Sequence, residues 1–136
     1  MTDYDVVWND SYLVGVPDMD EQHKTLVAMI NNLFELCKDG SAGTKSTFVG
    51  AFRRASEYAQ THLSAEEEYL AKIGYPSLDE QKKEHVAFMD EVWRQFEKFN
   101  KDNTAPPIEL PRFLKKWLMN HIAVKDKLYG VFAATK

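Results

Sequence analysis

The stretch FVGAFRRASEYAQTHLSAEEEYLAKI, residues 48–73, combines the pattern of a long helix with two polar residues on its apolar side. Its apolar residues recur in steps of three and four, at Phe48, Phe52, Ala55, Ala59, Tyr69 and Ile73. His62 and Glu66 continue the same series. Because this spacing places all members on one face of a helix, the stretch predicts a helix whose buried face includes an imidazole and a carboxylate.

Three other segments have the same periodicity, and each contains a histidine. The series are His23, Leu26, Ile30, Leu33 and Cys37; Leu78, Gln81, His85, Phe88, Val92, Phe96 and Phe99; and Leu110, Leu114, Trp117, His121, Val124, Leu128 and Val131. We expect helices at about 19–38, 45–73, 78–99 and 109–132. No strand-like alternation competes with this interpretation.

Local signals at the helix ends support these boundaries. Asp18 with Glu21, and Ser77 with Glu80, match the capping-box pattern of a helix start. Glycine, proline and polar residues separate the helices at 39–43, 74–76 and 100–107. Because short connections favour antiparallel neighbours, we expect an all-α, up-down-up-down antiparallel four-helix bundle. Residues 1–17 should form an extended N-terminal arm across it.

Size and composition limit the possible functions. With 136 residues the chain should form a single domain, 1–136, and its net charge of −4 argues against broad nucleic-acid binding. A lone cysteine, Cys37, excludes an intrachain disulfide and fits a cytoplasmic setting. The acidic start at 1–5 is unlike a signal peptide, and no run approaches the ~20 apolar residues of a membrane span.

The inward-facing polar residues predict a metal site. All four histidines fall on the core-facing series of different predicted helices, and Glu66 lies four residues after His62. A buried carboxylate is unfavourable unless a positive charge neutralises it, and a cation held among imidazoles would do so. Facing helices of a bundle build such sites from one or two inward side chains each. The sequence therefore indicates a two-metal site with Glu66 between the ions.

Asp126 is at ligand spacing but not at ideal helical spacing. It follows His121 by five residues, which is about 140° around an ideal helix. Its participation requires a local π-type widening near Ala123–Asp126, or a reach from the side of the helix. We predict a distortion there, and ordinary helix geometry with Asp126 in solvent would exclude it from the site.

Several fragments together resemble the hemerythrins, in particular the single-domain bacterial ones. The matching fragments are Trp8, Gly15-Val16, Asp20-Glu21-Gln22-His23, His62-x-x-x-Glu66, Gly74-Tyr75-Pro76, Glu84-His85 and Trp117-Leu118-x-x-His121-Ile122-x-x-x-Asp126-x-x-Tyr129. The likeness covers nearly the whole chain, and the combination is far more specific than any one fragment.

The resemblance implies a non-haem di-iron centre that binds dioxygen reversibly, for storage, buffering or delivery, in a protein that is not an enzyme. It assigns His23 and His62 to one iron, Gln81, His85 and His121 to the other, and Glu66, Asp126 and an oxo or hydroxo group to the bridges. It also implies an apolar dioxygen pocket at Leu26, Ile30, Trp117, Leu118 and Ile122, with Tyr129 behind the ligands. We expect a monomer whose partner is an O2-consuming enzyme or an electron donor.

Gln81 departs from the family pattern, which has histidine at this position. Its amide oxygen could bind iron as a harder and weaker donor than imidazole, or it could leave a water on that iron. It could equally be an ordinary polar residue near a helix start. An open position would favour the alternative function, a di-iron redox enzyme acting on peroxide, nitric oxide or an organic substrate. Iron storage or sensing is a third hypothesis, and zinc or manganese could occupy the same ligands.

Overall fold

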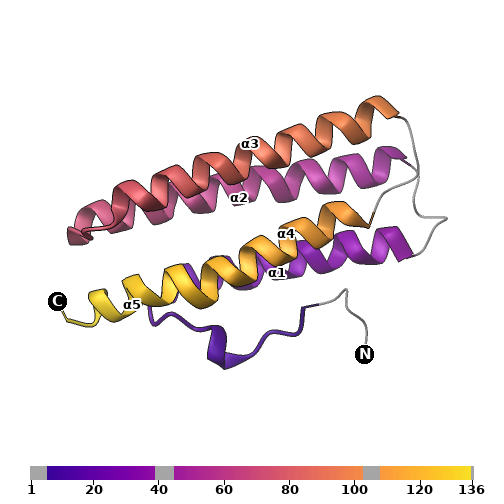
Figure 1. The fold of residues 1–136 in the computed structure, drawn as a ribbon. Helices are drawn as coiled ribbons and strands as arrows, with labels where there is room; N and C mark the ends of the chain where they lie inside the picture. Colours follow the sequence, from indigo (N-terminus) through magenta and orange to yellow (C-terminus); the bar gives the residue numbers. More distant parts are fainter. Residues whose placement is uncertain (1–5, 39–44, 103–107, 136) are drawn as a thin grey trace.

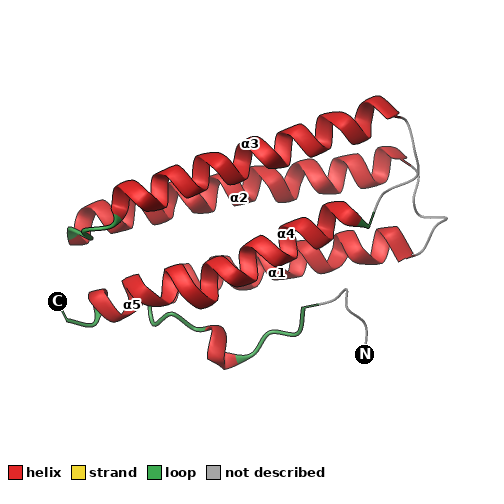
Figure 2. Cartoon of the chain, viewed as in Figure 1, coloured by secondary structure: helices red, strands yellow, loops and turns green. Residues whose placement is uncertain are grey.

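The computed structural model describes residues 6–38, 45–102 and 108–135, and within these ranges every regular element is a helix. Figure 2 shows helices and loops, with no strand among the described residues. The elements are η1 (Asp10–Tyr12), α1 (Pro17–Lys38), α2 (Lys45–Ile73), α3 (Leu78–Asp102), α4 (Glu109–Asn120), η2 (His121–Asp126) and α5 (Lys127–Ala133).

The helices form the predicted antiparallel four-helix bundle. α4, η2 and α5 are consecutive segments of one long helix, so the bundle has four members (Figure 1). α1 packs against α2 and α4, and α3 packs against the same two helices. The apolar faces of all four meet in one core that runs the length of the bundle.

Two of the expected boundaries need correction. α1 begins at Pro17 rather than at 19, so Asp18 lies in its first turn and is not the cap of a capping box. Proline is favoured at the first position of a helix because its fixed φ suits the helix and its missing N–H is not needed there. α3 continues to Asp102 rather than ending at 99. The expected break at 39–43, and residues 103–107 of the break expected at 100–107, lie outside the described residues.

The end of α2 has the expected glycine stop. Gly74 has a φ of 71°, its N–H donates to the carbonyl of Ala71, and the N–H of Tyr75 donates to the carbonyl of Leu70 at 2.9 Å. This pair of bonds is the Schellman arrangement, which closes a helix on a residue with positive φ. The stop therefore sets where the chain turns into α3.

The N-terminal arm lies along the bundle and is tied down by two polar side chains (Figure 1). Asn31 accepts from the N–H of Val6 and donates to its carbonyl, both at 2.7 Å. The buried carboxylate of Asp20 accepts from the N–H groups of Val14 at 2.7 Å and Gly15 at 3.2 Å. These bonds satisfy arm groups that would otherwise be buried without partners.

The last helix changes from the α form to the π form at η2, from His121 to Asp126. The predicted distortion is thus confirmed. A π turn takes in an additional residue, so the inward face shifts by one position, about 100°, beyond it. This shift overturns the expected burial of Val124, Leu128 and Val131, whose exposed fractions are 48%, 56% and 68%. Asp126, Tyr129 and Gly130 face the interior instead.

Candidate metal centre

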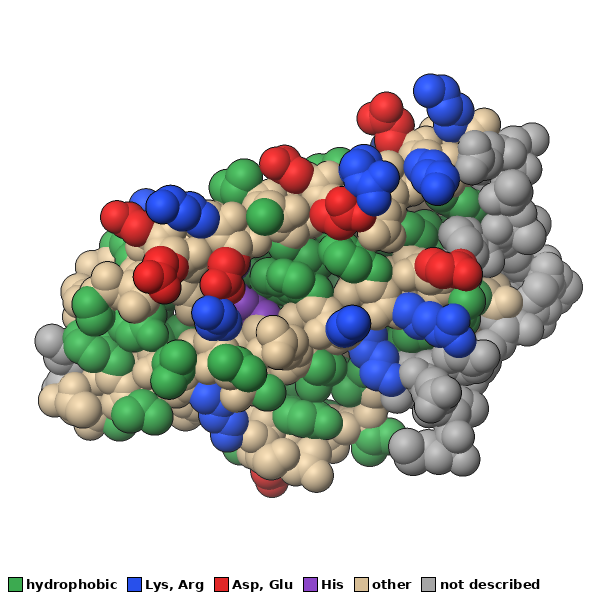
Figure 3. Space-filling view, in the orientation of Figure 1, with side chains coloured by type: hydrophobic (Ala, Val, Ile, Leu, Met, Phe, Trp, Pro, Cys, Tyr) green, Lys and Arg blue, Asp and Glu red, His purple; other side chains and the backbone are tan. Residues whose placement is uncertain are grey.

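Six predicted site residues meet inside the bundle, and each is at most 2% exposed. α1 supplies His23, α2 supplies His62 and Glu66, α3 supplies His85, and η2 supplies His121 and Asp126. In the face drawn in Figure 3, histidine atoms are visible only in one small gap between charged and apolar surface side chains. The predicted burial of the histidines, Glu66 and Asp126 is confirmed.

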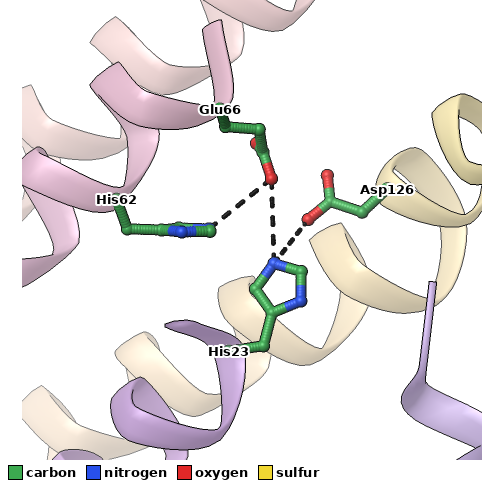
Figure 4. Close-up of side chains that lie close together, drawn as sticks. All are labelled: His23, His62, Glu66 and Asp126. Atoms are coloured by element: carbon green, nitrogen blue, oxygen red, sulfur yellow. Dashed lines mark ion pairs between the residues drawn. The ribbon is translucent and has the colours of Figure 1, made fainter. Parts of the chain in front are cut away.

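The donor atoms form two groups with one shared member. His23, His62, Glu66 and Asp126 bring donor atoms within 4.8 Å of one another, and Glu66, His85 and His121 do the same. Figure 4 shows the first group, in which Glu66 and Asp126 both point toward His23. Glu66 is the donor residue that the two groups have in common.

Glu66 divides its two oxygens between the groups. Its Oε2 lies 3.7 Å from His23 Nε2 and 3.5 Å from His62 Nε2. Its Oε1 lies 3.2 Å from His85 Nε2 and 3.0 Å from His121 Nε2. A carboxylate placed in this way has the geometry to bridge two metal ions.

Asp126 also contacts both groups, with one carboxylate oxygen near each. Its Oδ2 lies 2.9 Å from His23 Nε2 and its Oδ1 lies 2.9 Å from His121 Nε2. The π turn is the reason, because in an ordinary helix this residue would face away from His121. A second carboxylate is therefore available as a bridge.

The donor atoms are close but poorly hydrogen-bonded to one another. His23 Nε2, His62 Nε2 and both Asp126 carboxylate oxygens are buried and lack a partner with hydrogen-bond geometry. His85 Nε2 and His121 Nε2 face each other at 3.3 Å, so at most one can carry a proton between them. An unsatisfied buried polar group costs about 1–3 kcal/mol. Cations among these atoms would satisfy all of them, so the donor set fits a metal pair.

Outer hydrogen bonds orient two of the imidazoles. His62 Nδ1 donates to Gln22 Oε1 at 2.6 Å, and His85 Nδ1 donates to Glu67 Oε2 at 2.7 Å. With the proton on Nδ1, each Nε2 is free to bind a metal. The sequence alone predicted no role for either partner, Gln22 or Glu67. No periodic signal marks them, because each contact joins two different helices.

The charges of the site stabilise one another strongly. Burial by itself would lower the pKa of His23, but Asp126 and Glu66 raise this pKa to about 9. The same competition raises the pKa of His121 to about 10. Burial opposes ionisation of Glu66, yet contacts with the histidines, His121 foremost, hold its pKa well below the usual range. The acids thus require positive charge beside them, from imidazolium or from metal.

Tyr129 is the residue behind Glu66, as the resemblance implied. Its hydroxyl donates to Glu66 Oε2 at 2.9 Å. Burial, followed by the charges of Asp126 and Glu66, raises the pKa of this phenol. The hydroxyl therefore stays protonated and remains a donor to the carboxylate.

An apolar cavity of about 20 Å³ lies beside His62. Four of the five predicted pocket residues line it, namely Leu26, Ile30, Trp117 and Leu118. Ile122 is fully buried but is not among the lining residues. A space of this size holds about one water-sized molecule.

Gln81 lies on the buried face of α3, one turn before His85. It is 4% exposed, and its amide oxygen has no hydrogen-bond partner. This burial argues against the reading of Gln81 as an ordinary polar residue at a helix start.

The fold and the donor set define a four-helix-bundle protein with a candidate dinuclear metal centre. The sequence matches the hemerythrin HHE cation binding domain over residues 14–132. The chain therefore belongs to the hemerythrin family, a di-iron, oxygen-binding family.

Individual relatives agree with this assignment. A bacteriohemerythrin of Clostridium acetobutylicum is 32% identical over 125 residues, which cover 90% of this chain and 97% of that protein. A hemerythrin-like protein of Naegleria gruberi is 30% identical, with 90% and 88% covered. A crystal structure of wild-type hemerythrin superimposes with a TM-score of 0.82 at 28% identity, covering 92% of this chain and 95% of that one. Among the described residues, none of the helices combines the length and the hydrophobicity needed to span a bilayer.

Proposed function

We propose that this protein binds two iron ions in its core and uses them to hold dioxygen reversibly. One ion is assigned to His23 and His62, the other to His85 and His121, and Glu66 and Asp126 bridge them. The observation that supports this most is the division of the two oxygens of Glu66 between the histidine pairs, at 3.0–3.7 Å. When bound, a di-iron pair supplies the electrons for reversible dioxygen binding.

The surrounding residues have supporting roles in this proposal. The cavity lined by Leu26, Leu114 and Trp117 beside His62 admits a molecule of dioxygen's size and excludes bulk water. Gln22 keeps the His62 ring in its metal-binding tautomer. Tyr129 holds the Glu66 carboxylate in place through its hydroxyl.

The test is anaerobic iron loading followed by repeated cycles of air and argon, observed by visible absorption. Reversible binding predicts a band that appears in air, disappears in argon and survives many cycles. His62→Ala should lose the band, whereas Gln60→Ala, on an exposed part of α2, should retain it. Irreversible change to a stable oxidised form in the first cycle would contradict the carrier function.

The second candidate is a di-iron redox enzyme, and the buried Gln81 is the observation that favours it. If its amide binds iron more weakly than imidazole, a coordination position could open to a substrate. The small cavity favours peroxide or nitric oxide over an organic substrate. Turnover of added peroxide by the iron-loaded protein, faster than by free iron, would support this candidate.

We also propose a monomer in the cytoplasm that supplies dioxygen to an O2-consuming enzyme or accepts electrons from a donor. Light scattering during gel filtration tests the monomer directly, and localisation of a tagged chain tests the compartment.

A further inference from the structure

The amide oxygen of Gln81 is a polar atom that the fold buries without a partner. Its amide oxygen lies in the protein interior, and no N–H or O–H of the described residues donates to it. Buried amides are nearly always hydrogen-bonded, and the exceptions call for a specific explanation such as an ion. A leucine or methionine would fill the same space without this cost.

The position of Gln81 on its helix connects it to the donor group that contains His85. Gln81 and His85 are four residues apart on α3, so their side chains lie on one face. His85 belongs to the group with Glu66 and His121, and Oδ1 of Asp126 lies 2.9 Å from His121 Nε2. The residue with the unpaired amide oxygen is therefore one helical turn from a member of this group.

We propose that the amide oxygen of Gln81 is a ligand of the metal ion held by Glu66, His85 and His121. This inference rests on the proposed function, because it requires a metal pair. A neutral carboxamide oxygen is a harder and weaker donor than an imidazole for iron, and it suits manganese better. The two ions then differ in their ligands, because only the ion held by Glu66, His85 and His121, which we call the second ion, has a carboxamide donor.

The outer hydrogen bonds of the two ends fit this asymmetry. His62, at the end without Gln81, has the neutral amide of Gln22 as its partner. His85, at the end with Gln81, has the anionic carboxylate of Glu67. A carboxylate partner makes an imidazole a stronger ligand. The weaker oxygen donor is thus accompanied by a strengthened histidine.

The variant Gln81→Met distinguishes a metal ligand from an amide that only stabilises the fold. The two roles predict opposite changes in the unfolding temperature of the metal-free protein. The metal-free variant, prepared with chelator, should unfold a few degrees higher than the metal-free wild type, since the unpaired oxygen is gone. Calorimetric titration with Fe(II) under argon should show the second ion binding at least ~tenfold more weakly, with the first ion unchanged. Gln95→Met, on the same helix outside the site, is the matched control for metal binding and should leave the affinities for both Fe(II) ions nearly unchanged.

Gln81→His provides the complementary test. It should tighten the second Fe(II) site and reduce its preference for Mn(II) over Fe(II) relative to the wild type. If Gln81→Met does not fold, as judged by circular dichroism, Gln81→Glu replaces it and should bind the second ion more tightly.

The contrary result is also defined. If Gln81→Met unfolds at a lower temperature without metal and binds two ions like the wild type, or if Gln81→His and Gln81→Glu leave the second site unchanged, Gln81 is not a ligand. A wild-type protein that binds no metal pair would instead refute the proposed function itself. The wild-type titration therefore distinguishes the two failures.

Discussion

At the scale of single residues, the site is a balance between burial and opposite charge. Glu66 is fully buried and is tolerated because four imidazoles and the Tyr129 hydroxyl surround it. Its inward position was predictable from the His62–Glu66 spacing. Its partners Gln22 and Glu67, by contrast, depend on which helices face each other, and one sequence does not contain that information.

Replacing Tyr129 with phenylalanine tests the support of Glu66. The ring packing is kept, but Oε2 of Glu66 loses a donor at 2.9 Å, and hydrogen bonds to charged groups contribute about 1.5–3 kcal/mol. We expect a decrease of this size in the unfolding free energy, measured with urea. Tyr12→Phe in the arm is the control for loss of a hydroxyl. Equal stability of Tyr129→Phe and the wild type would show that Glu66 does not need this donor.

The metal-free protein should lose stability as the pH rises above neutrality. The folded-state pKa values of His23 and His121 are raised to about 9 and about 10, above the unfolded value of about 6.5. Groups raised in this way stabilise the fold fully below the unfolded pKa, and this contribution is lost as the pH passes through the folded pKa. Thermal unfolding with chelator should therefore show a falling Tm between about pH 7 and pH 10.

Metal loading provides the control for this pH dependence. Metal-bound histidines carry no titrating proton on Nε2, so the Tm of the loaded protein should change much less over the same range. A metal-free Tm that is constant or rises with pH would mean that the histidines are not charged in the empty core.

At the scale of elements, the π turn η2 links the shape of the last helix to the site. The spacing of His121 and Asp126 predicts this distortion, since no ordinary helix places both residues inward. The consequence for Val124, Leu128 and Val131 was not anticipated, because the apolar periodicity continues unbroken through the turn. A repeat pattern read across a change of helix type therefore assigns the wrong face beyond it.

Gly130 on α5 tests the packing of the arm on this shifted face. A Cβ added there would lie 2.1 Å from the carbonyl oxygen of Val14, so Gly130→Ala must push the arm away. We expect destabilisation of about 1–3 kcal/mol, measured by chemical unfolding. Gly50→Ala in α2 meets only the flexible end of Arg54 at 3.4 Å and should be neutral or stabilising. Similar effects for both variants would contradict the close contact between arm and α5.

At the scale of the whole molecule, the bundle and the metal centre depend on each other. The order of helices and the apolar core were predictable from periodicity, because the core requires only that each series faces inward. The pairing of donors across helices was not, since it depends on helix rotation and on the π turn. The metal pair then stabilises a core that contains acids and imidazoles.

Metal loading should therefore raise the stability of the fold. A ligand at about 100 times its Kd stabilises a protein by about 2.7 kcal/mol, roughly 10 °C in Tm for a chain of this size. Calorimetry should show such an increase with Fe(II) under argon and its reversal by chelator. The double variant His62→Ala, His85→Ala should show no increase. If Fe(II) does not change the Tm of the wild type, metal binding does not stabilise the fold.

Diffraction from crystals of the iron-loaded protein, with data collected at the iron absorption edge, tests the central claim most directly. We expect two anomalous peaks inside the bundle, one beside His23 and His62 and the other beside His85 and His121, with Glu66 between them. A map without a peak in the core, from protein shown to contain iron, would contradict a buried metal pair.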